Sequence, residues 1–405
     1  MQRIAIVDPS ETSREALRAL LLGVDFVWLE AECARYEYFY EVVKQATPDM
    51  VVISLDADRT KALQMISQLA ADYPKMPMLT ISSDHQALLE SLQRGARYFL
   101  TQPVGLEDLL TALRRALNES GSFMTAPGQV SQTPQNSSMI AMLGSRGGVG
   151  CTTLGVNLAA TLAAEPTNNV ALIDLDLALG DADIVLDMSA IDTLSMADLA
   201  RKIERLDMNY LKRAAAKHPE TGVSLLRHPL EMHEISLIHE GHVERILNLL
   251  RISYPTLILD LSKALLPTDL VAMRMADTIL LTAQLELSSL RNVVRLMHLL
   301  GQEDNLADRV KIIINRVGSE AIEEGISLKK AEEVIGKPIY WQIPNDSKAM
   351  IAARIAGEPL VTHNPKCRAQ LAISGLAQTL VGKTSAPVPA DAKVKSSGWR
   401  MFGRK

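Results

Sequence analysis

Short apolar runs alternate with amphipathic helical stretches in two separate blocks of this 405-residue chain. A strand buried on both faces reads as a short apolar run, and the helix that follows it buries only one stripe of its surface. The alternation therefore predicts an α/β fold with two doubly wound domains, each a parallel sheet with helices on both faces. The length suffices for two or three domains with cores of their own.

Two segments without apolar periodicity interrupt this pattern. Both are rich in Ser, Pro and other small or polar residues, a composition typical of flexible chain. We therefore expect a first α/β domain at 1–118, a flexible linker at 119–138, a second α/β domain at 139–383 and a flexible tail at 384–405.

Composition excludes several classes of protein. A net charge of −5 argues against a large basic DNA-binding face, and an aromatic content of 4% argues against stacking platforms for single-stranded nucleic acid. The cysteines Cys33, Cys151 and Cys367 are too far apart for a zinc motif and fit a reducing compartment. The chain shows neither the apolar core of a signal peptide at its start nor an apolar run of membrane-spanning length. We expect a cytoplasmic protein for which DNA is not a partner.

The first block contains five candidate strands separated by helical patterns. They lie at 3–8, 26–31, 49–55, 77–82 and 97–101. This arrangement, with "PDMVVIS" leading to the end of the third strand, resembles the receiver domain of two-component response regulators. The resemblance implies a flavodoxin-like fold.

The phosphorylation chemistry of that family is missing from this block. The resemblance maps the phospho-accepting aspartate onto Ser54 and the lysine onto Gln102, and only Asp8 is left of the acidic pair that holds the metal. A serine cannot form an acyl phosphate, and one carboxylate fewer weakens Mg²⁺ binding. Asp56 and Asp58 lie nearby and are expected to be solvated loop carboxylates. We therefore expect a pseudo-receiver, whose helical face can bind another protein.

The second block opens with a glycine-rich loop between an apolar strand and a helical pattern. "MIAMLGS" is the strand, "RGGVGCTT" is the loop, and Leu154, Leu158 and Leu162 form one helical stripe. Glycines let backbone N–H groups approach an anion, and the helix N-terminus adds partial positive charge. This order favours a phosphate-binding site, with a tight turn that binds nothing as the alternative for the loop alone.

Polar side chains follow the apolar strands of the same block. Asp174 and Asp176 end one strand, Asp260 ends another, and Asn315 and Arg316 end a third. Because parallel strands end at the same edge of a sheet, we expect these side chains to lie beside the loop, where open α/β sheets bind ligands.

The order of these motifs resembles the MinD/ParA family of deviant-Walker ATPases, over residues 139–382 and including "IPND" and "GEPL" near the end. The resemblance implies ATP and Mg²⁺ as cofactors. By position, it implies Mg²⁺ ligands at Thr152, Asp174 and Asp260. It implies nucleotide contacts at Gly147, Gly148, Val149, Gly150, Cys151, Thr152, Thr153, Asn315, Arg316, Pro344, Asn345 and Asp346.

The same resemblance implies two catalytic residues, and it shows that one lysine of the family's loop is missing here. Asp176 would orient the attacking water, and Arg146 would reach the γ-phosphate across a sandwich dimer. Cys151 stands where the family has its second loop lysine. A lysine–phosphate contact is worth about 1.5–3 kcal/mol, so ATP binding can survive its loss while turnover suffers more. We expect weak or absent hydrolysis; Lys263 is a further cation nearby, but nothing in the sequence fixes its direction.

A pseudo-receiver ahead of such an ATPase domain resembles the TadZ/CpaE family of localisation and assembly factors for type IVb (Flp/Tad) pili. The resemblance implies a homodimeric, nucleotide-dependent scaffold. Its partners would be the pilus or secretion ATPase and inner-membrane assembly proteins. The protein would associate peripherally with the inner membrane, with a location at the cell pole as one option. The alternatives are an active MinD/ParA-type ATPase in DNA partitioning or in division-site or flagellar-site placement, and a structural protein with an empty nucleotide site.

Two further features are open to more than one interpretation. The tail ends in "WRMFGRK", a mixture of aromatic and basic residues that suits a membrane interface when a dimer presents two copies. A disordered or partner-binding tail is the alternative. Five histidines between Lys217 and His242 lack metal-site spacing, so we expect a surface cluster.

Overall fold

We describe the chain from a computed structural model. It covers residues 1–405 apart from 23, 25, 85, 120–136, 167, 189–192, 207, 304–305, 319–325 and 383–405. The expected linker at 119–138 lies mostly outside the described residues, and the expected tail at 384–405 lies wholly outside them.

The described chain forms two compact units. The first unit contains Met1–Ser137, Thr193–Ala216 and Gly241–Pro255, and the second contains Ser138–Asp192, Lys217–Glu240 and Thr256–Lys405. The first unit thus combines the expected first domain with two later segments. The expected bounds of the second domain, 139–383, stay a prediction.

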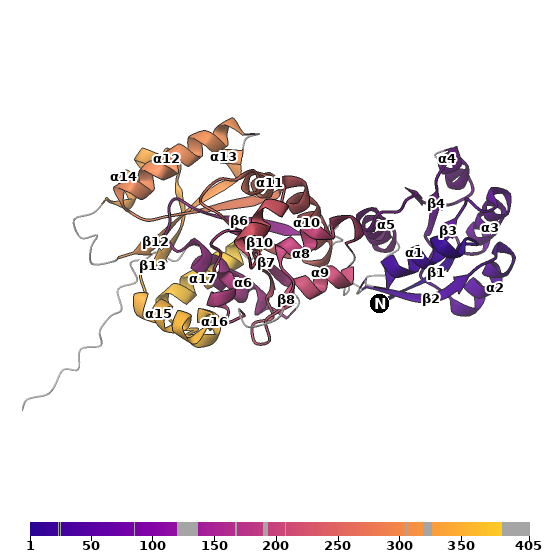
Figure 1. Cartoon of the computed structure of the whole chain (residues 1–405), viewed down its shortest axis with the longest axis horizontal. Coiled ribbons are helices and arrows are strands. Elements are labelled where there is room, and N and C mark those ends of the chain that lie inside the picture. The colour runs from indigo at the N-terminus through magenta and orange to yellow at the C-terminus, as the bar shows by residue number, and fades with distance from the viewer. Residues whose placement is uncertain are drawn as a thin grey trace, which may run out of the picture. The chain divides into compact units, whose positions relative to one another are not determined.

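The first unit contains a five-stranded parallel sheet in the order β2-β1-β3-β4-β5 (Figure 1). This is the strand order of flavodoxin-like folds, as predicted. The inner strands β3 and β4 consist wholly of buried residues, which explains their continuous apolar sequence. The strands are β1 (Gln2–Val7), β2 (Val27–Cys33), β3 (Met50–Ser54), β4 (Met78–Ser82) and β5 (Tyr98–Thr101).

Helices alternate with these strands and begin at capping side chains. Ser10 accepts a hydrogen bond from the Ser13 N–H at the start of α1, and Asp58 accepts one from the Lys61 N–H at the start of α3. The helices are α1 (Glu11–Leu21), α2 (Tyr36–Ala46), α3 (Arg59–Asp72), α4 (Gln86–Gln93) and α5 (Leu106–Glu119). The later segments of this unit hold α8 (Met196–Arg201), η1 (Ile203–Arg205), α9 (Met208–Ala214) and most of α10 (Glu240–Ser253).

The second unit is built on an eight-stranded sheet in the order β13-β12-β11-β6-β10-β7-β9-β8. Neighbouring strands from β13 to β9 are parallel. The strands are β6 (Ser138–Gly144), β7 (Val170–Leu175), β8 (Ala216–Lys217), β9 (Ser224–Leu226), β10 (Thr256–Leu261), β11 (Thr278–Ala283), β12 (Val310–Val317) and β13 (Ile339–Pro344).

Helices cover both faces of this sheet, with α12 and α14 on one side and α6 and α17 on the other (Figure 1). α6 is buried along most of its length, and a Cβ at Gly155 would already stand 3.4 Å from Met142 Cγ. The helices are α6 (Cys151–Ala163), α7 (Ala182–Val185), η2 (Met232–Leu237), α11 (Pro267–Met275), α12 (Leu287–Gln302), α13 (Leu306–Arg309), α14 (Leu328–Ile335), α15 (Ser347–Ala356), α16 (Leu360–His363) and α17 (Arg368–Leu380).

The strand order positions a ligand site. β6 lies between β11 and β10, so the chain winds away from it in both directions and leaves a crevice at its carboxyl end. The glycine-rich loop leaves β6 at this point. Among the described residues, no helix is both long enough and apolar enough to cross a membrane.

Candidate functional site

The glycine-rich loop connects β6 to α6 with an open outer surface. Gly148 and Gly150 have φ angles of +77° and +91°, in the left-handed region that favours glycine. A Cβ at Gly147 or Gly148 would meet no atom within 4 Å. α6 begins directly at Cys151, so its unpaired N–H groups lie at the end of the loop. The loop can therefore receive an anion against its backbone.

β12 holds the other side of this loop. The Asn315 amide donates to the Val149 carbonyl at 2.7 Å, and the Arg316 guanidinium donates to the Gly148 carbonyl at 3.3 Å. A Cβ at Gly150 would lie 2.6 Å from Asn315 Nδ2, so only glycine fits there. Asn315 thus stabilises the conformation of the loop. Its contact with an adenine edge stays a prediction.

Arg146 contacts its own chain. Its guanidinium forms an ion pair with Glu286 and donates to Gln284 Oε1 at 3.3 Å. Beside it, Ser145 Oγ lies 2.7 Å from Ser289 Oγ, which ties the loop to the start of α12. The predicted contact of Arg146 with a γ-phosphate across a dimer therefore requires that the ion pair with Glu286 first opens.

The carboxylates predicted for the strand ends lie together. Asp260 on β10 stands in register with Asp174 on β7 and with Met142 on β6. Both carboxylates are almost completely buried, and neither oxygen of Asp260 has a well-formed hydrogen bond to a described residue. Burial, followed by the charge of Asp174, raises the pKa of Asp260 to about 7, although the Thr152 hydroxyl is close enough to oppose the rise.

Asp174 is held more firmly than Asp260. It accepts hydrogen bonds from the Asp176 N–H at 3.1 Å and the Ala182 N–H at 3.3 Å, and its Oδ2 lies 3.3 Å from His228 Nδ1. Burial raises the pKa of Asp174, and the contact with Asp174 raises the pKa of His228. A Cβ at Gly180 would stand 2.3 Å from Asp174 Oδ2, so this glycine is needed for the packing.

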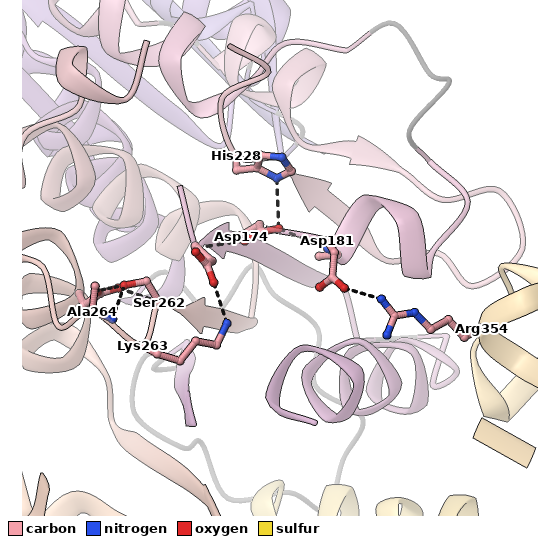
Figure 2. A network of polar contacts seen from close by, with 10 residues as sticks. Asp174, Asp181, His228, Ser262, Lys263, Ala264 and Arg354 are labelled. Atoms are coloured by element: carbon pink, nitrogen blue, oxygen red, sulfur yellow. Dashed lines mark hydrogen bonds and ion pairs between the residues drawn. The ribbon is translucent and has the colours of Figure 1, made fainter. Parts of the chain in front are cut away.

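Asp176 forms an ion pair that the sequence did not specify. Lys263, two residues after the end of β10, donates from Nζ to Asp176 Oδ2 at 2.6 Å. Figure 2 shows Lys263 and His228 on opposite sides of the strand end that carries Asp174. The turn that carries Lys263 is held by Asp269, which accepts from the Ser262 N–H at 3.0 Å.

Cys151 is a buried, neutral residue at the start of α6. Its side chain is 3% exposed. Burial, reinforced by the charge of Asp260, raises the pKa of the Cys151 thiol well above its usual range. Because the thiolate is the reactive form, this position is poorly suited to redox chemistry. A small neutral side chain fits this environment.

A groove runs from the loop to the segment after β13. It is lined by Gly150, Asn315 and Arg316 together with Pro344, Asn345 and Asp346. Arg354 of α15 also lines it and pairs with Asp181 at 2.7 Å (Figure 2). All the residues predicted to contact the base thus border one groove beside the loop, although the contacts themselves are untested.

The donor set fits Mg²⁺. Asp174, Asp260 and the Thr152 hydroxyl offer only oxygen atoms, the ligands that this ion prefers. The strongest sign is Asp260, a carboxylate that is 1% exposed and lacks a well-formed hydrogen bond to any described residue. A buried anion in such a place is costly unless a cation accompanies it.

In the first unit, the described polar groups around the phospho-acceptor position bond to one another. The Tyr36 hydroxyl donates to the Ser54 carbonyl at 2.6 Å, and burial raises the pKa of Tyr36. Asp56 accepts hydrogen bonds from the Ser82 hydroxyl and, at 2.9 Å, from the Ser83 N–H. Asp56 is exposed, as expected for a loop carboxylate, and it also binds the polar groups at the end of β4.

Two histidines of the expected surface cluster are not on the surface. His218 is 7% exposed and lies 3.0 Å from the Thr221 hydroxyl, and His228 contacts Asp174. Hydropathy could not place them, because each contacts a polar partner, with His218 buried and His228 only partly exposed. Within the described parts of the chain, no three His, Cys, Asp or Glu side chains form a metal-binding group of their own.

Comparison with known proteins agrees with both folds. Residues 4–114 match the response regulator receiver domain family, and residues 137–312 match the AAA domain family. The chain is 25% identical to a putative septum site-determining protein MinD of Tupiella akineta, over 67% of this chain and 86% of the relative. It is 26% identical to an uncharacterized ATP-binding protein of Methanocaldococcus jannaschii, over 66% of this chain and 97% of the relative.

A solved structure extends the comparison to three dimensions. The ParA family ATPase from Chlorobium tepidum superposes with a TM-score of 0.56 at 24% identity, covering 60% of this chain and 98% of that one. At this identity the likeness concerns the fold.

Proposed function

We propose that this chain, which joins a receiver domain to a MinD/ParA-like P-loop NTPase domain, binds ATP with Mg²⁺ and hydrolyses it weakly or not at all. One observation carries the proposal. The open glycine loop lies at the same sheet edge as Asp260, a buried carboxylate without a well-formed hydrogen bond. A relative named for ATP binding supports the choice of nucleotide.

Each residue of the site would contact the phosphates, Mg²⁺ or the attacking water. The N–H groups of the loop and of the first turn of α6 would bind the phosphates, with the Thr153 side chain toward the α-phosphate. Asp174, Asp260 and Thr152 would hold Mg²⁺, which supplies charge neutralisation at the phosphates when bound. Asp176 would orient a water molecule. Cys151 contributes no charge, so stabilisation of the transition state is incomplete.

We propose further that the ATP-bound form is a homodimeric scaffold for a type IVb pilus or related secretion machinery. The fusion of a receiver domain without its phospho-acceptor to a loop without its second lysine supports this role. The partners would be the secretion ATPase and inner-membrane assembly proteins, reached at the membrane surface, where the C-terminal tip would add affinity.

An active MinD/ParA-type ATPase in site placement or DNA partitioning is the second candidate. The septum site-determining names of several relatives favour it. The two candidates differ in turnover, because a placement cycle needs repeated hydrolysis and a scaffold does not.

Titration of the full chain with Mg-ATP, followed by single-turnover hydrolysis, tests the proposal. We expect saturable binding within millimolar ATP and little product. Rapid hydrolysis that membrane or DNA stimulates would favour the second candidate. Absence of binding would leave only a structural protein with an empty site.

A further inference from the structure

A lysine that follows β10 lies at the same strand ends as the loop that lacks one. β10 is hydrogen-bonded to both β6, which carries the loop, and β7, which carries Asp174. Lys263 follows β10 after one intervening residue, Ser262. Its side chain is 34% exposed and its ammonium lies 2.6 Å from Asp176 Oδ2. Lys263 therefore brings a positive charge to the strand ends beside the loop.

Other cations near the loop bond to groups other than the carboxylates that end β7 and β10. The Arg146 guanidinium pairs with Glu286, and the Arg316 guanidinium donates to the Gly148 carbonyl. Arg354 pairs with Asp181 at the far end of the groove. Of these four cations in the described chain, Lys263 is the one whose ion pair is made with a strand-end carboxylate.

The Lys263 ammonium stays charged in this setting. Burial acts to lower the pKa of Lys263, but the hydrogen bond to Asp176 and the charges of Asp176 and Asp260 outweigh it, so the net shift is upward. Asp260 acts on the pKa of both the Lys263 ammonium and the Cys151 thiol, so both groups lie around the same buried carboxylate. A lysine has a flexible four-carbon stem, so a small movement of the head group needs no movement of the backbone.

We propose that Lys263 is the phosphate-binding cation of this site in place of the lysine absent at position 151, and that Asp176 holds it while no nucleotide is bound. The inference rests on the proposed ATP binding. The phosphates and Asp176 then compete for one ammonium. Nucleotide binding frees the Asp176 carboxylate to accept a hydrogen bond from water, so the site becomes competent only when it is filled.

The two halves of this ion pair should respond in opposite directions. Lys263→Met keeps the length of the side chain and removes its charge, and we expect Mg-ATP binding to weaken ten- to a hundred-fold. Lys263→Arg should retain most of the affinity. Asp176→Asn should bind Mg-ATP at least as tightly as the unsubstituted chain, because the ammonium is then released in advance.

A matched control separates this effect from net charge and folding. Lys61→Met removes the same charge and the same kind of ion pair, with Glu37 at 2.7 Å, from the first unit. It should leave Mg-ATP affinity unchanged. Thermal unfolding of each variant without nucleotide reports on the fold.

A lysine introduced at position 151 should restore the Mg-ATP affinity that Lys263→Met removes. We expect Cys151→Lys to tighten Mg-ATP binding more in the Lys263→Met chain than in the unsubstituted chain, because a second cation adds less than a first. Isothermal titration with Mg-ATP on the full chain measures all of these affinities.

The outcomes separate this inference from the proposed function. If the unsubstituted chain binds Mg-ATP and Lys263→Met binds it equally well, the inference is wrong and the proposed function stands. Equal weakening by Lys263→Met and Asp176→Asn would show a purely structural ion pair and also overturn the inference. If the unsubstituted chain fails to bind, both fall together.

Discussion

At the scale of single residues, position 151 decides how much chemistry the loop can perform. The thiol is buried beside Asp260 and its pKa is raised by that burial, so it adds no charge of either sign. The proposed site otherwise has its loop backbone and its oxygen ligands. A phosphoryl transfer needs positive charge where negative charge grows, and this is the part that Cys151 fails to supply.

Cys151→Lys should tighten Mg-ATP binding up to about ten-fold and raise turnover by a larger factor. The larger effect on turnover is expected because the added charge acts more strongly on the transition state than on the ground state. Mg-ATP titration and single-turnover hydrolysis on both chains measure the two factors. Equal hydrolysis rates in the two chains would show that Cys151 does not limit turnover.

Asp260 is a second residue whose surroundings matter, because its ionised carboxylate is costly in the fold without a bound cation. Its pKa is raised to about 7, mainly by burial. In the folded state it therefore holds a proton more tightly than in the unfolded chain, where the pKa is near 3.9. Stability of the nucleotide-free protein should consequently rise as pH falls from 7 toward 4, and the cost of the ionised form is fully present above pH 7.

Asp260→Asn should raise the free energy of unfolding of the nucleotide-free protein by about 2–4 kcal/mol at pH 8. The gain should shrink as pH falls from 7 toward 4, because the native carboxyl is then neutral as well. Urea unfolding at pH 8 and at pH 5 measures it.

Asp181→Asn is the control for Asp260→Asn. It removes a carboxylate of the same unit whose ion pair with Arg354 is partly exposed, so we expect a change below about 1 kcal/mol. A variant at Asp260 that is destabilised at both pH values would mean that its carboxylate is satisfied in a way the structure does not show.

At the scale of elements, hydrogen bonds satisfy polar groups at the carboxyl ends of β3 and β4. The Tyr36 hydroxyl from α2 caps the Ser54 carbonyl at the end of β3. The Asp56 carboxylate that follows β3 is bound by Ser82 and Ser83 at the end of β4. These contacts use the polar groups around the position where a receiver domain accepts phosphate, and they stabilise the sheet.

The receiver domain should remain unmodified when the chain is incubated with acetyl phosphate and Mg²⁺. Ser54 cannot form an acyl phosphate, and the neighbouring Asp56 already accepts three hydrogen bonds. Intact mass spectrometry beside an unrelated, functional receiver domain checks the result. A hydroxylamine-labile adduct on this chain would contradict the prediction.

At the scale of the whole molecule, the expected active form is a dimer. Arg146 can reach a second subunit only after its ion pair with Glu286 opens. The ion pair is partly exposed, so opening costs about 1 kcal/mol or less.

Mg-ATP should shift the full chain from monomer to dimer. Light scattering with and without Mg-ATP measures the mass. Arg146→Ala should leave nucleotide affinity within a few-fold and weaken dimer formation, because its charge is then missing at the interface. A mass that nucleotide leaves unchanged would refute the dimer. The Glu286→Gln variant, which releases Arg146 in advance, should dimerise at least as well.

The sequence was sufficient for the two α/β folds and for the sheet edge at which the candidate residues gather. Strand runs of four to eight residues, and helices that bury one stripe, are determined by local hydropathy. Parallel strands must end at one edge, so Asp174, Asp260 and the loop had to meet there. The absence of a lysine at position 151 is also read directly from the sequence.

Only the tertiary structure decided where the polar groups point and which partners they take. Lys263, His228 and Asp56 are all ordinary polar residues in the sequence, yet each is bonded to a group from another segment of the chain, 26 to 87 residues away. A contact across that separation depends on how the turns after the strands are packed, which no local pattern records. Hydropathy therefore identifies the edge of the sheet where the site lies, while the pairing of its charges, and with it the distinction between a resting and a competent site, is set by the fold.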